Sequence, residues 1–427
     1  MIGVEKLYVY DDDQLVGIIT KEPNGDYWFQ YDKDWVACED AFPLSLTLPL
    51  REEPFDKTTT ENYFEQLLPE GDVEEALIET QRLPSTFHFL KQYGADCAGK
   101  VRILSSKIAD QQTVKKNNYS STSVGLKEIP IDDIYDTLEE RELLATFVAR
   151  KNPGYFSIAG GQDKFVGIFS NGRIYLVQDG RPTTHIFKAP IQRNGISDTV
   201  WNEYFCLTLA AEAGLNTVQA QVLPGRYPLL AVYRYDRLER DGKVQRIHQF
   251  DAAQALGIKR SQKYEDFGGP SFKQIYNLIQ DIVFISEKIN AGEDILSWLA
   301  FNLLIGNNDT HAKNISFCTD GKKIILAPFY DLLSTAVYPS LKPSFAFKIG
   351  GSDDFAKMDG ACLAQLGKDL NLRPGVVEER FKRMIEILPD LTKKVAAKLK
   401  SQGGNVPVVK KIVNLIHQRC QKLKAKL

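Results

Sequence analysis

Apolar and polar residues alternate at the start of the chain with the period of two that is typical of β-strands. Residues 6–10 (KLYVY) and 15–20 (LVGIIT) flank an acidic turn, and 27–29 (YWF) continue the alternation, which predicts hairpins. The period then changes, because apolar residues lie three and four positions apart in 62–68 and 73–81. This spacing predicts short helices.

A polar stretch with few apolar residues, 106–125, predicts a linker or an exposed loop. Residues 137–152 have helical spacing, and Pro153-Gly154 is expected to end that helix. A second strand-rich region should follow, because short β-type runs are separated by glycine turns. These runs are 155–158, 165–169, 174–177, 184–188, 218–222 and 229–235, with a helix from Thr199 to Gly214 among them.

Beyond about residue 250 the spacing is mainly helical, except for a hairpin predicted at 315–327. The pattern therefore predicts an α+β protein with a β-rich N-terminal half and a mainly helical C-terminal half. A chain of 427 residues is long enough for two or three domains, and we expect the segments 1–110, 111–236 and 237–427. Two lobes of this kind should leave a cleft in which a ligand binds.

The composition is that of an ordinary globular protein, with 43% hydrophobic and 25% charged residues, and it excludes disordered and fibrous classes. Lysines and arginines total 53 against 55 aspartates and glutamates, so the formal net charge is −2. This balance argues against a general binder of nucleic acids or membrane surfaces, although it is compatible with one local basic patch.

The protein is expected to be cytoplasmic. No apolar run approaches the ~18 residues of a membrane span, since the nearest, 295–306, is short and contains Asn302. The N-terminus carries acidic residues where a signal peptide has a basic region and an apolar core. The six cysteines show no CxxC spacing, so we expect reduced thiols, and the dispersed histidines do not predict a zinc site.

The segment 306–314 (GNNDTHAKN) carries the strongest chemical signal. It follows an apolar helical run and precedes a strand, so it should form a loop. Four residues separate Asp309 from Asn314. Protein kinases use this gap between the aspartate that orients the acceptor hydroxyl and the asparagine that holds Mg²⁺. On the spacing alone, a helix-capping loop is the simpler alternative.

A hairpin and a second aspartate follow this loop in the order that kinases use. After the hairpin the chain reads FYD, ending at Asp331, which would bring another carboxylate to the phosphates. Asp331 and Asn314 together would suit Mg²⁺, which takes few protein ligands and several waters. The alternative is that Asp331 forms the N-cap of a helix that begins after it.

Residues 157–164 (SIAGGQDK) lie between two predicted strands. Gly160 and Gly161 would let backbone N–H groups approach phosphates closely, and Lys164 adds a cation. The motif is neither a Walker A sequence nor the glycine-rich loop of kinases. A plain hairpin turn is the alternative.

Two further features suit a nucleotide. Lys188 ends a strand, and Glu203 lies in the first turns of the next helix. Kinases pair a strand lysine with a helix glutamate to hold the α- and β-phosphates, although a surface lysine and a solvated glutamate are the alternative. Residues 230–237 (LAVYRYDR), where the two halves meet, could offer their backbone to an adenine edge as a hinge, or be only a strand between lobes.

Eight segments in order resemble the HipA family, the serine/threonine kinase toxins of bacterial toxin–antitoxin modules. They are SIAGGQDK, THIFKAP, NEYFCLTLA, AVYRYDR, HQFDAAQALGI, KYEDFGGP, GNNDTHAKN and PFYDLLS. The resemblance implies a two-lobed, protein-kinase-like fold with ATP and Mg²⁺ as cofactors. In that fold 1–110 would be the N-terminal subdomain, 111–236 the kinase N-lobe and 237–427 the helical C-lobe.

The resemblance also implies a role for each matching residue. Asp309 looks like the catalytic base, Asn314 and Asp331 like the magnesium ligands, and Lys188 like the lysine on the ATP phosphates. The phosphate loop and the other nucleotide contacts are implied at Ala159, Gly160, Gly161, Gln162, Asp163, Lys164, Tyr233, Arg234, Tyr235 and His311. Ser157 falls where the family has its autophosphorylated serine, and a phosphate there should eject the loop by repulsion and silence the kinase.

The sequence departs from the family pattern in two places. Tyr233 and Tyr235 stand where better-known members have an acid and a phenylalanine, but hinge contacts are largely made by the backbone, so ATP binding should survive. The stretch 190–198, where the family has its activation loop, is short, which leaves the choice of substrate open. The implied partners are a helix-turn-helix antitoxin, which would carry the DNA contacts, and a translation-related target such as an aminoacyl-tRNA synthetase.

Three functions stay open. The leading one is an ATP- and Mg²⁺-dependent toxin that phosphorylates serine or threonine of a protein. A small-molecule kinase of similar fold is an alternative, which phosphate transfer to a metabolite would favour. A catalytically weak co-repressor acting with the antitoxin is another, and growth arrest that is lost with Asp309→Asn would argue against it.

Overall fold

The computed structural model describes residues 4–108, 125–152, 159–404 and 406–427. The chain divides into two compact units. The first unit comprises residues 1–189 and 231–260, and the second comprises 190–230 and 261–427. The predicted strand 155–158 and most of the predicted linker 106–125 lie outside the described residues, as does Ser157.

The N-terminal part of the first unit is an antiparallel sheet in the order β3-β2-β1-β4. Its side chains alternate between buried and half-buried along β3, which is the period that predicted these strands. The strands are β1 (Glu5–Asp11), β2 (Gln14–Lys21), β3 (Tyr27–Tyr31) and β4 (Val101–Leu104), and the helices that accompany them are α1 (Lys33–Val36), α2 (Lys57–Phe64), α3 (Asp72–Gln81) and α4 (Thr86–Tyr93). The predicted hairpin strands and short helices are confirmed.

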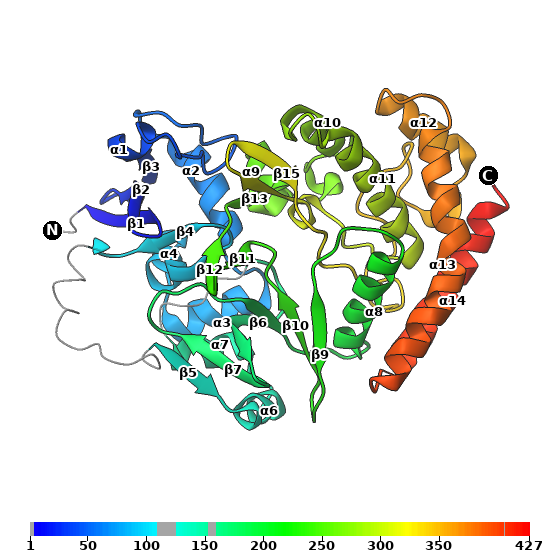
Figure 1. The fold of residues 1–427 in the computed structure, drawn as a ribbon, viewed down its shortest axis with the longest axis horizontal. Coiled ribbons are helices and arrows are strands. Elements are labelled where there is room, and N and C mark those ends of the chain that lie inside the picture. Colours follow the sequence, from blue (N-terminus) through cyan, green and yellow to red (C-terminus); the bar gives the residue numbers. More distant parts are fainter. Residues whose placement is uncertain (1–3, 109–124, 153–158, 405) are drawn as a thin grey trace. The chain divides into compact units, whose positions relative to one another are not determined.

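A second sheet completes the first unit, with strands neighbouring one another in the order β5-β7-β6-β8-β10 (Figure 1). These strands are β5 (Leu126–Ile129), β6 (Lys164–Ser170), β7 (Arg173–Val177), β8 (His185–Lys188) and β10 (Leu229–Tyr233), of which the last enters the unit at residue 231. The remaining elements are α6 (Ile131–Glu139), α7 (Leu144–Lys151), the hairpin β11 (Arg237–Arg240) and β12 (Lys243–Arg246), β13 (Gln249–Asp251) and α9 (Ala252–Leu256).

The prediction of a single helix over 137–152 is wrong, because α6 and α7 are separate. Arg141, between them, has a left-handed backbone with φ +57°, which a continuous helix does not allow. The backbone N–H groups of Leu144 and Ala145 donate to the Asp163 carboxylate at 2.8 and 2.9 Å. This distant carboxylate satisfies N–H groups of the first turn and gives α7 its own start.

The second unit is mainly helical. Its elements are α8 (Thr199–Glu212), β9 (Ala220–Leu223), α10 (Phe272–Ile282), α11 (Lys288–Ile305), β14 (Ser316–Asp320), β15 (Lys323–Leu326), α12 (Gly360–Asp369), α13 (Val376–Ser401) and α14 (Pro407–Lys424). Short 3₁₀ helices occur at Glu65–Leu67, Gly94–Asp96, Arg260–Gln262, Glu265–Phe267, Ala312–Asn314 and Phe355–Lys357. The predicted helix from residue 199 and the predicted hairpin, now β14–β15, are confirmed.

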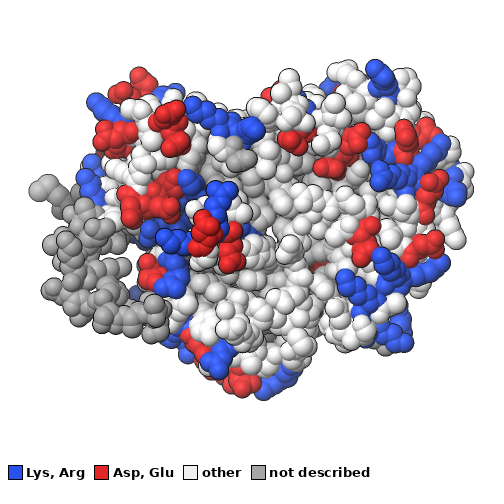
Figure 2. Space-filling view, in the orientation of Figure 1, with Lys and Arg blue, Asp and Glu red and all other residues white. Residues whose placement is uncertain are grey.

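Helix α11 forms the core of the second unit. Its C-terminal half is apolar on all sides, and Trp298, Leu299 and Phe301 are fully buried, which is the behaviour of a helix surrounded by protein. Helices α8, α13 and α14 pack together around it (Figure 1). On the solvent side of α13 and α14, basic side chains lie among acidic ones (Figure 2), and Lys382 pairs with Glu378 at 2.7 Å.

The strands gather in the N-terminal half and the long helices in the C-terminal half, so the predicted α+β class is confirmed. None of the helices in the described ranges combines the length and the apolar character that a membrane crossing requires. All six cysteines are free thiols, and four of them are buried.

Candidate active site

The 306–314 loop begins where α11 ends. Gly306 caps the helix with φ +74°, and a side chain there would be blocked, because a Cβ would lie 2.7 Å from that of Ala336. The loop then turns through the 3₁₀ helix Ala312–Asn314 into β14. The sequence order helix, loop and strand is therefore reproduced, and the loop's start is fixed by a position that only glycine fills without strain.

One uncharged side chain, Asn307, joins the two candidate aspartates. Its amide oxygen accepts the backbone N–H of Asp309 at 3.3 Å. Its amide nitrogen donates to Asn302 Oδ1 at 2.9 Å and to the backbone carbonyl of Asp331 at 3.1 Å. Because Asn307 is 1% exposed and Asn302 is fully buried, these bonds are shielded from water and fix both chain segments.

A second link brings Asn314 and Asp331 into one region. The Tyr330 hydroxyl donates to the Lys313 carbonyl at 2.5 Å and lies 2.7 Å from Ser316 Oγ. The residue before Asp331 is thus tied to the residue before Asn314. Together with the Asn307 bonds, this gathers the predicted base and both predicted metal ligands at one place in the second unit.

Asp309 itself is exposed to solvent, as a base that meets a substrate hydroxyl must be. The Tyr264 hydroxyl donates a hydrogen bond to its Oδ1. The ring of Tyr264 also meets that of His311 edge-on, with centroids 5.0 Å apart. The backbone N–H of His311 donates to Asn314 Oδ1 at 2.9 Å, so the loop residues also hold one another.

The predicted ligands fit a magnesium ion by their chemistry. Asp331 offers a carboxylate and Asn314 an amide oxygen, and hard oxygen donors are what Mg²⁺ selects. Asn314 Oδ1 already accepts one hydrogen bond, and an amide oxygen has a second lone pair. Among the described residues there is no cluster of three or more His, Cys, Asp or Glu side chains suited to a metal, so a site here would depend on this pair and on substrate oxygens.

The alternative reading of Asp331 as a helix N-cap is wrong, because residues 332–354, all of which the structure describes, contain no helix. Its backbone is instead left-handed, with φ +52°. Such a conformation costs free energy in a residue that has a Cβ, and it occurs often where function requires it. The bond from Asn307 to the Asp331 carbonyl helps to hold it.

In the first unit, the glycine loop 159–164 contacts the segment at residues 69–70. Gly160 bridges to Pro69, and its carbonyl accepts the N–H of Glu70 at 3.1 Å. The φ of Gly160 is +101°, and a Cβ there would lie only 3.1 Å from Lys164 Nζ. The positive φ favours glycine at this position, and an ammonium group lies beside it, so the chemistry would suit a phosphate.

The other loop residues have different surroundings. Asp163 does not face a ligand, because its two carboxylate oxygens accept the N–H groups that start α7. Burial raises the pKa of Asp163 in spite of these two bonds. Ala159 and Gln162 are half-buried and Gly161 is exposed. Their contacts with a nucleotide stay predictions.

Two lysines are paired on the neighbouring strands β6 and β8, which follow this loop in the chain. Lys164 on β6 is the direct cross-strand partner of Lys188 on β8, and directly paired residues of antiparallel strands point to the same face. They are 8% and 5% exposed. Two ammonium groups on one face of the sheet could together bind a polyphosphate, and this role of the pair stays a prediction. Glu203 is buried in α8, and its predicted pairing with Lys188 stays a prediction.

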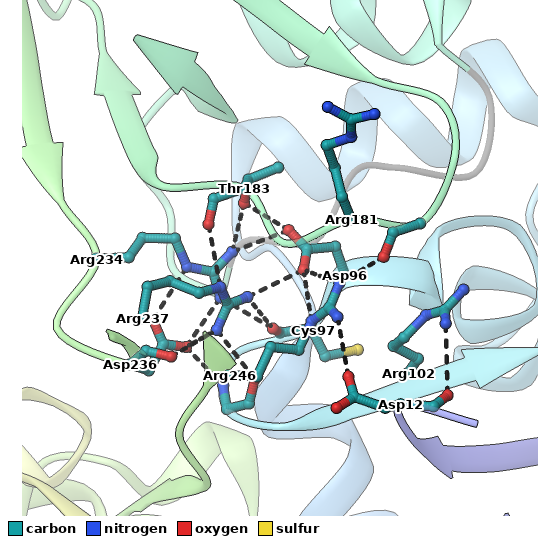
Figure 3. Close-up of polar contacts among 12 residues, drawn as sticks. Asp12, Asp96, Cys97, Arg102, Arg181, Thr183, Arg234, Asp236, Arg237 and Arg246 are labelled. Carbon is teal, nitrogen blue, oxygen red and sulfur yellow. Dashed lines mark hydrogen bonds and ion pairs between the residues drawn. The ribbon is translucent and has the colours of Figure 1, made fainter. Parts of the chain in front are cut away.

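The predicted hinge is anchored by a buried ionic cluster, which we call the arginine cluster (Figure 3). It consists of Asp96, Arg234, Asp236, Arg237 and Arg246. The Arg234 guanidinium bonds Asp96 at 3.1 Å and Asp236 at 2.9 Å. The side chain of Arg234 is therefore engaged below the hinge, and its predicted contact with a nucleotide would have to be made by its backbone.

Asp96 is the centre of this cluster. Its carboxylate pairs with Arg237 at 2.9 Å and Arg246 at 3.2 Å as well as with Arg234, and Asp96 and Arg237 are fully buried. Burial opposes the charge of Asp96, but the guanidinium groups outweigh it and hold the pKa of this carboxyl below its usual range. Thr183 also donates to Asp96.

The two tyrosines of the hinge have their own partners. The ring of Tyr233 meets His185 edge-on, with centroids 5.4 Å apart. The Tyr235 hydroxyl donates to Gln249 Oε1 at 2.8 Å. Between them, the Arg234 N–H donates to the Thr184 carbonyl at 2.9 Å. The Arg234 carbonyl also accepts the N–H of Arg237 at 3.2 Å. The hinge backbone is thus fixed on both sides, and of the Arg234 backbone only the second lone pair of this carbonyl could still meet an adenine.

Sequence reasoning missed Asn307, Tyr264 and Asp96. The first two lie inside segments that the sequence analysis singled out, GNNDTHAKN and KYEDFGGP, but no role was derived for them. A signal did exist for the asparagines, because Asn302 interrupts an otherwise apolar run and a buried amide needs partners. Asp96 lies 138 residues from Arg234, and no local pattern links the two.

Comparisons with known proteins identify the family of the chain. The sequence profile of the HipA N-terminal domain matches residues 7–104, and that of the HipA-like C-terminal domain matches residues 156–397. Protein Y4mE of Sinorhizobium fredii is 35% identical over 394 residues, which cover 90% of each chain. The serine/threonine-protein kinase toxin HipA of Shewanella oneidensis is 29% identical over 399 residues, covering 88% of this chain and 86% of that one.

A solved structure of the Shewanella oneidensis HipA toxin, in complex with HipB and its operator DNA, has the same fold. It matches with a TM-score of 0.81 at 24% identity, over 98% of this chain and 97% of that chain. The predicted HipA-like fold is therefore confirmed. Because the two profiles and the similar sequences together span both halves of the sequence, the chain belongs to the HipA family.

Proposed function

We propose that this protein is the toxin of a toxin–antitoxin module and acts as an ATP- and Mg²⁺-dependent serine/threonine kinase. The observation that carries the proposal is the arrangement in the second unit, where Asn307 holds both Asp309 and the backbone of Asp331. Kinases need one carboxylate at the acceptor hydroxyl and another at the metal. A loop that fixes two aspartates with a neutral amide meets this need.

In the proposed reaction Asp309 orients the acceptor hydroxyl and receives its proton. Asn314 and Asp331 would hold Mg²⁺ through their side-chain oxygens. The ion would neutralise negative charge on the transferred phosphoryl group when bound. Lys188, Lys164 and the glycine loop would bind the ATP phosphates, and the backbone at Tyr233–Tyr235 would meet the adenine.

The target is proposed to be a serine or threonine of a translation-related protein, with an aminoacyl-tRNA synthetase as the first candidate. The proposed partner is a small helix-turn-helix antitoxin, and DNA contacts would be made through it. The Shewanella oneidensis HipA complex with HipB and operator DNA supports this partner, because the fold matches over nearly the whole chain. Phosphorylation of Ser157 is the proposed means of self-silencing.

The test is incubation of the purified protein with γ-labelled ATP and Mg²⁺, beside Asp309→Asn, with the label mapped by mass spectrometry. We expect the wild type to label itself, with Ser157 carrying phosphate. Asp309→Asn should reduce transfer by about 10²–10⁴-fold, because it removes the group that accepts the proton. Its fold should survive, since Asp309 is exposed.

The matched control is Asp281→Asn, which makes the same chemical change at another exposed aspartate of the second unit. This variant should transfer phosphate at the wild-type rate. A wild type that binds ATP and has an unmodified Ser157 but transfers nothing would contradict the kinase proposal and favour the co-repressor. Label on a metabolite instead of protein would favour a small-molecule kinase.

A further inference from the structure

Tyr264 belongs to a tightly built turn, 263–270 (KYEDFGGP). The N–H groups of Phe267 and Gly269 both donate to the Tyr264 carbonyl, at 3.0 and 2.9 Å. Gly268 has φ +83°, and a Cβ at Gly269 would lie 2.2 Å from the Gln262 carbonyl oxygen. The two glycines are therefore required by the turn, and the turn fixes the backbone of Tyr264.

The turn is anchored on both sides within the second unit. The N–H of Ala312, in the 306–314 loop, donates to the Lys263 carbonyl at 3.4 Å. On the other side, the N–H of Lys348 donates to Glu265 Oε2 at 2.9 Å, and Lys342 pairs with Asp266 at 2.8 Å. The side chain of Tyr264 thus starts from a fixed position and is directed at the loop.

The Tyr264 side chain makes two contacts there. Its hydroxyl donates to Oδ1 of Asp309, and its ring packs edge-on against His311 with an interplanar angle of 83°. An exposed carboxylate can adopt several orientations, and each hydrogen bond that Asp309 accepts restricts them. A hydrogen bond from an anchored phenol fixes its rotation about the side chain and presents the same face of the carboxylate to an incoming hydroxyl.

We infer that Tyr264 is a positioning residue for phosphate transfer, which holds the Asp309 carboxylate in the orientation that receives the acceptor's proton. The inference rests on the proposed kinase function. Its physical basis is that small misplacements of a catalytic group cost about 10²-fold in rate. Because Tyr264 acts on Asp309 and not on the nucleotide, it should affect kcat and leave the KM for ATP unchanged.

The test compares Tyr264→Phe with the wild type in the labelled-ATP assay, with a protein or peptide acceptor. Removing only the hydroxyl should lower kcat by about 10-fold or more, with the KM for ATP within about 2-fold. Tyr276→Phe is the matched control, because it deletes a hydroxyl from the largely buried Tyr276 of α10 in the same unit. It should leave kcat unchanged, and equal melting temperatures would show that all three proteins are folded.

A double-mutant cycle with Asp309→Asn separates positioning from a merely structural role. If Tyr264 acts through Asp309, adding Tyr264→Phe to Asp309→Asn should cause no further loss of rate. A further loss of the same size as in the wild-type background would overturn the inference, as would an unchanged kcat in Tyr264→Phe alone. Phosphate found on Tyr264 in the wild type would also overturn it, because the hydroxyl would then be an acceptor.

These outcomes differ from a failure of the proposed function. If the wild type transfers no phosphate, the kinase proposal itself is contradicted. If the wild type and Tyr264→Phe transfer phosphate equally fast, only the role of Tyr264 is contradicted. Tyr264→Leu serves as a second variant, since it also removes the ring that packs on His311 and should lower kcat at least as far as Tyr264→Phe.

Discussion

In the first unit the hinge after β10 is held by three arginines and two aspartates, whereas in the second unit the 306–314 loop is held by neutral amides. We call the latter, Asn302, Asn307 and Asn308, the amide network. Both sets are buried: Asp96 and Asn302 are fully buried, and Arg234 and Asn307 are 4% and 1% exposed. Both networks therefore hold a chain segment in place, the arginine cluster with charged groups and the amide network with uncharged ones.

The difference follows from what each region is proposed to bind. A hinge contacts a neutral adenine through its backbone, so ionic groups beneath it do not disturb the ligand. The 306–314 loop is instead proposed to act through the carboxylates of Asp309 and Asp331, and a support made of charged groups would add strong electrostatic interactions with both. Amides supply donors and acceptors without adding charge, as Asn307 does for the backbone of both aspartates.

The largest expected effect on stability comes from removing the central carboxylate of the arginine cluster. Asp96→Asn leaves three buried guanidinium groups with the buried carboxylate of Asp236 and the exposed one of Asp12, and breaking a buried ion pair costs about 3–5 kcal/mol. We expect the unfolding free energy of the first unit to fall by about this amount. Hydrogen exchange of peptides covering β10 to β12 would measure it locally, and the exchange of α11 should change less.

The matched control for this change is Asp26→Asn, which breaks the surface pair with Lys57. The Asp26 side chain is 48% exposed, so water and salt already screen the pair and we expect no measurable change in exchange. Equal protection in Asp96→Asn and wild type would mean that the cluster does not stabilise the hinge. The proposed contrast would then be wrong for the first unit, because its ionic network would not stabilise the segment that it contacts.

The sequence predicted elements where the signal is local. Strands β1 to β3 follow from alternation, and the 306–314 loop follows from the helix before it and the strand after it. The break between α6 and α7 could not be predicted, because the carboxylate that caps α7 comes from Asp163, eighteen or nineteen residues later.

The candidate site divides in the same way. The order of Asp309, Asn314 and Asp331 predicted which residues would gather, and the structure brings their chain segments together through Asn307 and Tyr330. The buried groups that hold these segments could not be predicted, since Asp96 is separated from its arginine partners by 138 to 150 residues of sequence. Spacing patterns identify residues that do chemistry more readily than the buried groups that hold them.

Low pH should lower the stability of the first unit. This unit contains three histidines whose pKa is lowered by burial, His88, His185 and His248. Burial lowers the pKa of His248 to about 4, against about 6.5 in an unfolded chain. Below pH 6.5 the unfolded state therefore binds more protons, and stability is lost as the pH falls from 6.5 towards 4.

The loss from His248 alone should reach about 1.4 kcal/mol per pH unit in this window. Urea unfolding monitored by hydrogen exchange at pH 7, 5 and 4 would measure the slope for each unit. His248→Gln removes one of the three titrating groups and should reduce the slope of the first unit. An unchanged slope in that variant would mean that another group causes the acid sensitivity, and the histidine explanation would be wrong.

A variant of the amide network should have the smallest effect on stability. Asn307→Ala leaves the N–H of Asp309, the carbonyl of Asp331 and the side chain of Asn302 without this partner, which should cost about 1–3 kcal/mol. Its effect on phosphate transfer should be larger than its effect on stability, because both aspartates lose their support. The rate and the melting temperature, measured on the same preparation, would show this.

Asn308→Ala is the matched control, because it removes the same amide one residue along the loop. Asn308 donates to the carbonyls of Lys342 and Pro343 at 3.0 and 2.9 Å, so its side chain supports a different segment from the one that carries Asp331. It should destabilise the second unit by a similar amount but reduce transfer less. If both variants lost transfer in proportion to stability, the amides would serve the fold alone, and the neutral network would have no special part in holding the catalytic groups.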